Sequence, residues 1–135
     1  MLALQSACTI EEYLKEINFG KWEGLGFDQV KEQYPEDIEE WRRECGNFQF
    51  PQGDSIPAFY QRISDWFDNL LAGEFNRVLI VTHGGVLRCS VCHLLGLGQD
   101  HCFAFSFDEG SVSKVVVENG FARLEFLNCR QLWVK

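Results

Sequence analysis

The sequence has few basic residues and no long apolar run. It carries 12 Lys and Arg against 20 Asp and Glu, a formal net charge of -8. Nucleic-acid-binding proteins and proteins that bind anionic membranes both need clustered positive charge. A spanning helix needs about 18 apolar residues in a row, and residues 1–10 lack the pattern of a secretory signal. We therefore expect no nucleic-acid or membrane partner, and a cytoplasmic location.

Repeats and low-complexity tracts are also absent, and the chain contains only three prolines. Among its 135 residues, 46% are hydrophobic, with 12 Phe and 4 Trp. A chain of this length and composition can bury a substantial core. The composition predicts a single domain that covers residues 1–135.

Six cysteines raise the question of disulfides, metals and haem. In a cytosolic chain, free thiols are expected. Residues 89–93 spell C-x-x-C-H, the pattern of c-type haem attachment, but haem attachment requires export and the only Met is Met1. A zinc site that adds His101 and Cys102 is geometrically conceivable. We favour soft side chains that pack a helix face, and expect neither metal nor cofactor.

The stretch from 77 to 88 carries the strongest local signal. Residues 78–81 are apolar and mostly β-branched, which predicts a buried strand of a parallel sheet. His83 stands where that strand must end, Gly84 and Gly85 allow a tight turn, and residues 86–95 have helical spacing. Ligands of open α/β sheets bind beyond such strand ends, where helix N-termini attract anions. His83 is thus a candidate phosphate contact, the alternative being a residue that only caps the strand.

Other segments predict helices and a hairpin. Two short helices are expected at 27–34 and 36–45, and apolar residues at helical spacing predict a longer helix over 56–71. Asp54 or Ser55 is expected to cap the longer helix. Residues 103–107 alternate apolar with small side chains. Asn119-Gly120 between apolar runs predicts a hairpin of 113–118 with 121–127.

Three ordered motifs resemble those of the histidine phosphatase, or phosphoglycerate mutase-like, superfamily. Residues 82–88 resemble its second-histidine motif, residues 14–24 resemble L-x-E-x-x-F-G-x-W-E-G, and residues 51–55 resemble P-x-G-E-S with Asp for Glu. Residues 110–113 and 127–128 resemble its C-terminal strands, and the branch containing α-ribazole phosphatase is the most similar. The resemblance implies a three-layer α/β/α fold with a C-terminal β-hairpin.

Two family elements have no counterpart in these residues. Members begin with a strand carrying R-H-G, whose His is the nucleophile, but the three histidines here are His83, His93 and His101 and none follows an Arg. The S-x-L-x-R-A element, which supplies a second phosphate-binding Arg, is also missing. The sequence therefore looks like the N-terminally truncated, C-terminal two-thirds of such a domain.

The resemblance assigns roles to the matching positions. Glu16 is the candidate acid and base, His83 stabilises the phosphoryl group, and Gly84 lets the backbone approach the phosphate. Glu16 as an ordinary exposed loop acid is the alternative. Trp22 and Glu23 are expected to be structural, and Arg88 to point away from the site.

The implied reaction is metal-free hydrolysis of a small phosphorylated metabolite, with α-ribazole 5'-phosphate as the leading substrate. A mutase or sugar-phosphate phosphatase, and a non-catalytic phosphate- or protein-binding fragment, remain alternatives. Without the R-H-G strand, residues 78–81 would present an unpaired edge, which predicts self-association.

Overall fold

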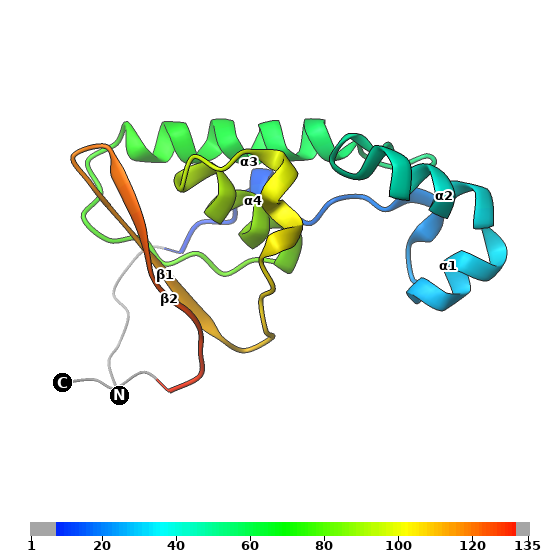
Figure 1. Cartoon of the computed structure of the whole chain (residues 1–135). Helices are drawn as coiled ribbons and strands as arrows, with labels where there is room; N and C mark the ends of the chain where they lie inside the picture. Colours follow the sequence, from blue (N-terminus) through cyan, green and yellow to red (C-terminus); the bar gives the residue numbers. More distant parts are fainter. Residues whose placement is uncertain (1–7, 132–135) are drawn as a thin grey trace.

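The computed structural model describes residues 8–131, and Figure 1 shows their arrangement. Within these residues, four α-helices precede a two-stranded antiparallel sheet. Two short 3₁₀ turns come before α1, one follows α2 and one follows α4. The helices and strands are α1 (Phe27–Gln33), α2 (Pro35–Glu44), α3 (Ile56–Leu71), α4 (Gly84–Leu94), β1 (Val112–Glu118) and β2 (Phe121–Cys129). The 3₁₀ turns are η1 (Glu12–Leu14), η2 (Gly20–Trp22), η3 (Cys45–Asn47) and η4 (Gln99–Ala104). No helix among these residues is long and apolar enough to cross a membrane.

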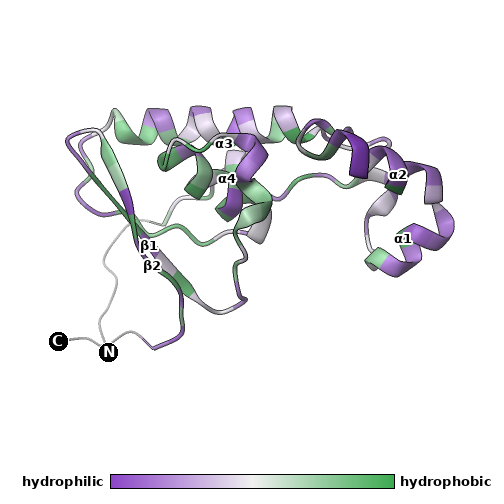
Figure 2. Cartoon of the chain, viewed as in Figure 1, coloured by the Kyte–Doolittle hydropathy of each residue, from purple (hydrophilic) through white to green (hydrophobic). Residues whose placement is uncertain are grey.

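The longest helix, α3, supplies several of the buried side chains of the core. Its predicted bounds and cap are confirmed, since Ser55 Oγ accepts the Ala58 N–H at 3.2 Å. Phe59, Ile63 and Phe67 recur at helical spacing and are buried. In Figure 2 the apolar side of α3 faces α4, which crosses beneath it. A three-layer fold would place this stripe on a sheet, but here it packs on α4.

Helices α1 and α2 form an arm at the end of the molecule away from the hairpin (Figure 1). Pro35 begins α2, where its missing N–H costs no hydrogen bond. The ring of Trp41 links this arm to the body, because it packs edge-to-face against Phe27 at 5.9 Å and against Phe103 at 6.3 Å. The arm and the body therefore face each other across aromatic side chains.

The C-terminal hairpin forms as predicted. Asn119 and Gly120 both have positive φ, 52° and 79°, which a tight two-residue turn between twisted strands requires. Asn128 ties the far end of the hairpin to the preceding loop, since its Oδ1 accepts the Asp108 N–H and its Nδ2 donates to Ser106 O, both at 2.9 Å. The chain is therefore a mixed α/β structure with a C-terminal antiparallel hairpin.

The predicted buried strand at 78–81 was wrong. The segment is irregular and open, with Leu79 72% exposed and Val81 91% exposed. Within residues 8–131, no backbone hydrogen bond reaches residues 74–81. An apolar, β-branched run favours a strand, but a strand also needs a neighbour to pair with. The first part of the alternating stretch 103–107 belongs to η4.

Candidate active site

The backbones of the motifs at 14–24 and 51–55 are in direct contact. Gly20 has a φ of +57°, and a Cβ there would overlap the carbonyl oxygen of Pro51. A Cβ on Gly53 would likewise overlap the carbonyl oxygen of Asn18. The contact is closed by Asp54, whose N–H donates to Asn18 O at 2.8 Å and whose Oδ2 accepts the Asn18 N–H at 3.0 Å. Both glycines are therefore required by close backbone approach.

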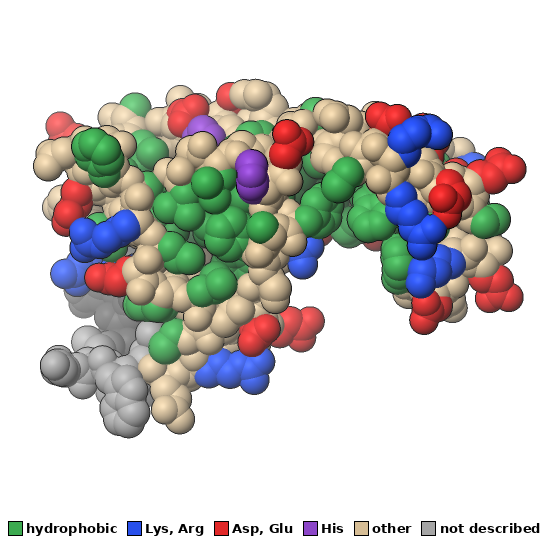
Figure 3. Space-filling view, in the orientation of Figure 1, with side chains coloured by type: hydrophobic (Ala, Val, Ile, Leu, Met, Phe, Trp, Pro, Cys, Tyr) green, Lys and Arg blue, Asp and Glu red, His purple; other side chains and the backbone are tan. Residues whose placement is uncertain are grey.

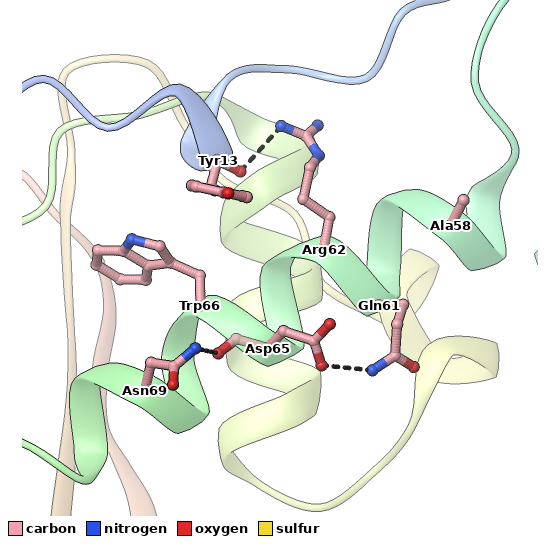
Figure 4. A pocket seen from close by; sticks show the side chains of 7 residues that line it. All are labelled: Tyr13, Ala58, Gln61, Arg62, Asp65, Trp66 and Asn69. Atoms are coloured by element: carbon pink, nitrogen blue, oxygen red, sulfur yellow. Dashed lines mark hydrogen bonds between the residues drawn. The ribbon is translucent and has the colours of Figure 1, made fainter.

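Helix α3 holds the segment that leads into Glu16. The Arg62 guanidinium donates to three carbonyl oxygens at and just after η1: Glu12 O (3.3 Å), Tyr13 O (2.9 Å) and Lys15 O (3.0 Å). Figure 4 shows Arg62 reaching from α3 to the chain at Tyr13, above a shallow surface hollow. Carbonyl oxygens that would otherwise face solvent are thus fixed to a rigid helix, and Glu16 follows directly.

Glu16 meets the start of α4, although 69 positions separate it from its partner. Its Oε2 accepts the Gly85 N–H at 3.0 Å, and its Oε1 accepts the Ile17 N–H at 3.0 Å. Thr82 adds a second link, since its hydroxyl donates to Leu14 O at 2.6 Å. The N-terminus of a helix carries free N–H groups and partial positive charge, which favour a carboxylate. A negative side chain therefore sits at the position where a phosphate would also be attracted.

His83 and Gly84 lie next to this contact. His83 is the N-cap of α4, with extended backbone and an exposed side chain. Among the described residues, its ring has no hydrogen-bond partner. Gly84 is the first helical residue, and a Cβ there would meet nothing within 4 Å. Glu16 therefore contacts the first turn of α4, which His83 caps. The space beside Gly84 is empty of protein atoms from residues 8–131.

Trp22 and Glu23 are structural, as predicted. The Trp22 indole is 9% exposed and packs against the rings of Phe48 at 5.4 Å and Phe50 at 5.3 Å. Glu23 Oε1 accepts the Phe19 N–H at 2.8 Å and closes the turn between them. These two residues shape the loop after Glu16 and hold it against the core.

A hollow of about 860 Å³ opens beside Gly85, between the arm and the body. Figure 3 shows hydrophobic side chains on its walls. Its aromatic lining comes from Phe19, Trp22, Phe27, Trp41, Phe50, Phe59 and Phe103.

Arg88 lines the same hollow. The prediction that Arg88 points away from the phosphate site at His83 stays a prediction. Counted from Gly85, Arg88 lies at i+3 and shares its face.

Two buried cysteines of α4, Cys89 and Cys92, lie beside buried Cys102 of η4. Cys102 Sγ and Cys89 Sγ are 3.9 Å apart, and Cys92 is fully buried. Burial raises the pKa of the Cys92 thiol to about 12, and the contact with Cys89, followed by burial, raises the pKa of Cys102. Cys92 and Cys102 are therefore neutral thiols in the core near neutral pH.

The other two histidines make hydrogen-bond contacts away from Glu16 and His83. His93 Nε2 lies 2.7 Å from Asp68 Oδ1, and His101 Nδ1 lies 2.7 Å from Leu97 O. Between residues 8 and 131, no group of three or more His, Cys, Asp or Glu side chains is placed to hold a metal ion.

Comparison with known proteins identifies relatives of this chain. It is 30% identical over 109 residues to phosphoserine phosphatase 1 of Hydrogenobacter thermophilus, covering 80% of this chain and 52% of that protein. It is 29% identical over 126 residues to the adenosylcobalamin/alpha-ribazole phosphatase of Escherichia coli, covering 90% of this chain and 61% of that one. The chain thus spans about half to three-fifths of the length of these relatives.

A solved structure and a family model complete the comparison. The alpha-ribazole phosphatase of Shigella flexneri superimposes with a TM-score of 0.86 at 27% identity, covering 98% of this chain and 66% of that one. The fold is thus that of the phosphoglycerate mutase-like histidine phosphatases. The model of the histidine phosphatase superfamily (branch 1) matches residues 2–130, nearly the whole sequence. The chain belongs to the histidine phosphatase superfamily.

Proposed function

We propose that this chain forms the acid–base and phosphate-stabilising part of a phosphomonoester hydrolase. The observation that carries the proposal is the hydrogen bond from the Gly85 N–H to Glu16 Oε2. It places a carboxylic acid at the N-terminus of a helix that His83 opens. Such a helix end attracts a phosphate, so the acid would lie beside the ester bond that breaks.

The reaction follows the family's chemistry. A nucleophilic His, which the motif R-H-G supplies in relatives, attacks phosphorus as the bond to the leaving oxygen breaks. Glu16 gives its proton to that oxygen, and afterwards takes a proton from the water that releases phosphate. His83 and the N–H of Gly84 stabilise the charge that develops on the phosphoryl oxygens. No metal ion or cofactor takes part in this proposal.

The substrate that we propose is α-ribazole 5'-phosphate. The likeness to alpha-ribazole phosphatases in both sequence and structure supports it. L-Phosphoserine is the second candidate, because a phosphoserine phosphatase is 30% identical to this chain. Cytoplasmic location remains a prediction from the sequence.

The experiment supplies the missing nucleophile in trans. The chain is mixed with the R-H-G segment of the E. coli relative, and phosphate release from p-nitrophenyl phosphate and both candidate substrates is measured. We expect no release above background from the chain alone, and turnover from the mixture. Glu16→Gln should lower that turnover by about 10²–10⁴-fold. Glu12→Gln, a change at an exposed acid nearby, is the matched control.

Two outcomes would overturn this assignment. Turnover by the chain alone that disappears in His83→Ala would make His83 the nucleophile. If sedimentation instead shows that the complex assembles while no substrate releases phosphate, that result would favour a non-catalytic phosphate- or protein-binding fragment.

We also propose that the free chain self-associates through residues 74–81. Val78, Leu79 and Val81 are 48%, 72% and 91% exposed, and the backbone beside them has no partner within residues 8–131. An open apolar segment of this kind pairs readily with another chain. Sedimentation should detect a dimer that Val81→Lys weakens and that the R-H-G segment displaces. A strict monomer at high concentration would disprove this.

A further inference from the structure

The hollow beside Gly85 has the size and lining of a small-molecule site. Its volume of about 860 Å³ falls within the roughly 300–1,000 Å³ that ligand pockets occupy. Rings from three parts of the chain converge on it: Trp22 after Glu16, Trp41 from the arm, and Phe103 from η4. Aromatic side chains fit planar ligands well, because they offer a large rigid surface.

One cation interrupts this apolar lining. Among the described residues, Arg88 makes no ion pair, and its Nε is buried without a hydrogen-bond partner. The Nε1 of Trp22, in the same walls, is also buried without one. An unpaired guanidinium in an apolar setting is costly, and it stacks on aromatic faces or donates to an acceptor atom. The lining therefore favours a ligand that is both aromatic and able to accept a hydrogen bond.

The hollow also adjoins the proposed site of phosphate chemistry. Gly85 belongs to both, since its N–H holds Glu16 and its surface lines the hollow. Arg88 stands three residues further, about 4.5 Å along the axis of α4. A phosphate at the N-terminus of α4 would thus place its leaving group at the mouth of the hollow.

We infer that this hollow binds a planar aromatic ring of the leaving group, with Arg88 as the polar contact to that ring. The inference rests on the proposed function and narrows its substrate class. A benzimidazole meets both requirements, since it is flat and its second ring nitrogen accepts a hydrogen bond. A serine-type leaving group can accept a hydrogen bond through its carboxylate, but it has no aromatic ring.

The test is binding of 5,6-dimethylbenzimidazole, the base of α-ribazole, to the chain as it stands. Indole N–H signals are followed by two-dimensional ¹H–¹⁵N NMR and assigned with single Trp→Phe variants. We expect the signals of Trp22 and Trp41 to shift saturably, with a Kd on the order of millimolar for so small a probe. The signal of Trp66, which lies on α3 outside the hollow, should stay in place.

Substitutions separate the contact from general binding. Arg88→Met keeps the apolar stem and removes the guanidinium, and should weaken the probe about 3- to 10-fold. Arg43→Met, at an exposed arginine of the arm, should leave binding unchanged. If Arg88→Met loses the folded spectrum, Arg88→Lys and Trp41→Leu take its place, and both should weaken binding.

The inference fails if the probe shifts neither Trp22 nor Trp41, or shifts Trp66 equally. It also fails if L-phosphoserine shifts these signals and the probe does not, or if folded Arg88 variants bind the probe normally. Because the probe carries no phosphate, binding does not depend on turnover. A complemented enzyme that hydrolyses only phosphoserine, with no probe binding, would leave the function standing and remove this inference alone.

Discussion

Helix α3 and the segment 74–81 are neighbours in the chain and similar in apolar content, yet they end in opposite environments. Ile63 in α3 has no exposed surface, whereas Val81 is 91% exposed. A helix completes its backbone hydrogen bonds within four residues and needs a neighbour only for its apolar stripe. A strand needs a second strand for both. The same hydrophobic driving force therefore buries one segment and leaves the other open.

Hydrogen exchange should show the largest difference between the two regions. Amides in the middle of α3 should open only with most of the domain, whereas those of 77–81 should exchange almost as in an unfolded chain. With a domain stability of roughly 5–15 kcal/mol, the ratio of rates should exceed about 10³-fold. NMR exchange measured at Ile63 and Leu79 checks it. Protection at Leu79 would mean that some part of the chain or a second copy covers the segment.

Truncation of side chains tests the same contrast in stability. Ile63→Ala should lower the free energy of unfolding by about 2–5 kcal/mol, because it leaves a cavity between α3 and α4. Leu79→Ala should change it by no more than about 0.5 kcal/mol, because that side chain is 72% exposed. Urea unfolding of both variants decides. Equal losses would mean that the two regions are buried alike in solution.

Substitutions at Gly84 and Gly85 test how closely the start of α4, where segment 74–81 joins the core, packs against Glu16. Gly85→Ala places a methyl group against Glu16 Oε1 and 3.0 Å from its Cδ, and should cost about 1–3 kcal/mol. Gly84→Ala meets nothing within 4 Å and should be neutral or slightly stabilising. Thermal unfolding of the pair measures the difference. If Gly85→Ala is as well tolerated as its neighbour, Glu16 does not rest on the start of α4.

The smallest effect concerns the hydrogen bond that holds the end of the segment. Thr82→Val removes the hydroxyl that donates to Leu14 O, and should cost roughly 0.5–1.5 kcal/mol. Thr82→Ser keeps the hydroxyl and should recover most of that loss. Urea midpoints of both variants give the comparison, and a serine variant as weak as valine would point to the methyl group instead.

Local patterns predicted several parts of this protein well. The bounds of α3, its Ser55 cap and the Asn119-Gly120 hairpin depend on residues within a few positions of one another. The structural roles of Trp22 and Glu23 followed from their place in a motif and are confirmed by their contacts.

The sequence by itself thus determined the elements whose hydrogen bonds form between residues close in the chain. It also determined family membership, through the order of its motifs. Only the tertiary structure decided the rest. The contact of Glu16 with Gly85 joins segments 69 positions apart, and the direction of Arg88 depends on where α4 begins and on the arm that faces it. The tertiary structure also decided the conformation of residues 78–81, because an apolar, β-branched run favours strand pairing but does not supply the partner strand. A helix carries its own hydrogen-bond partners in its sequence, and a strand does not.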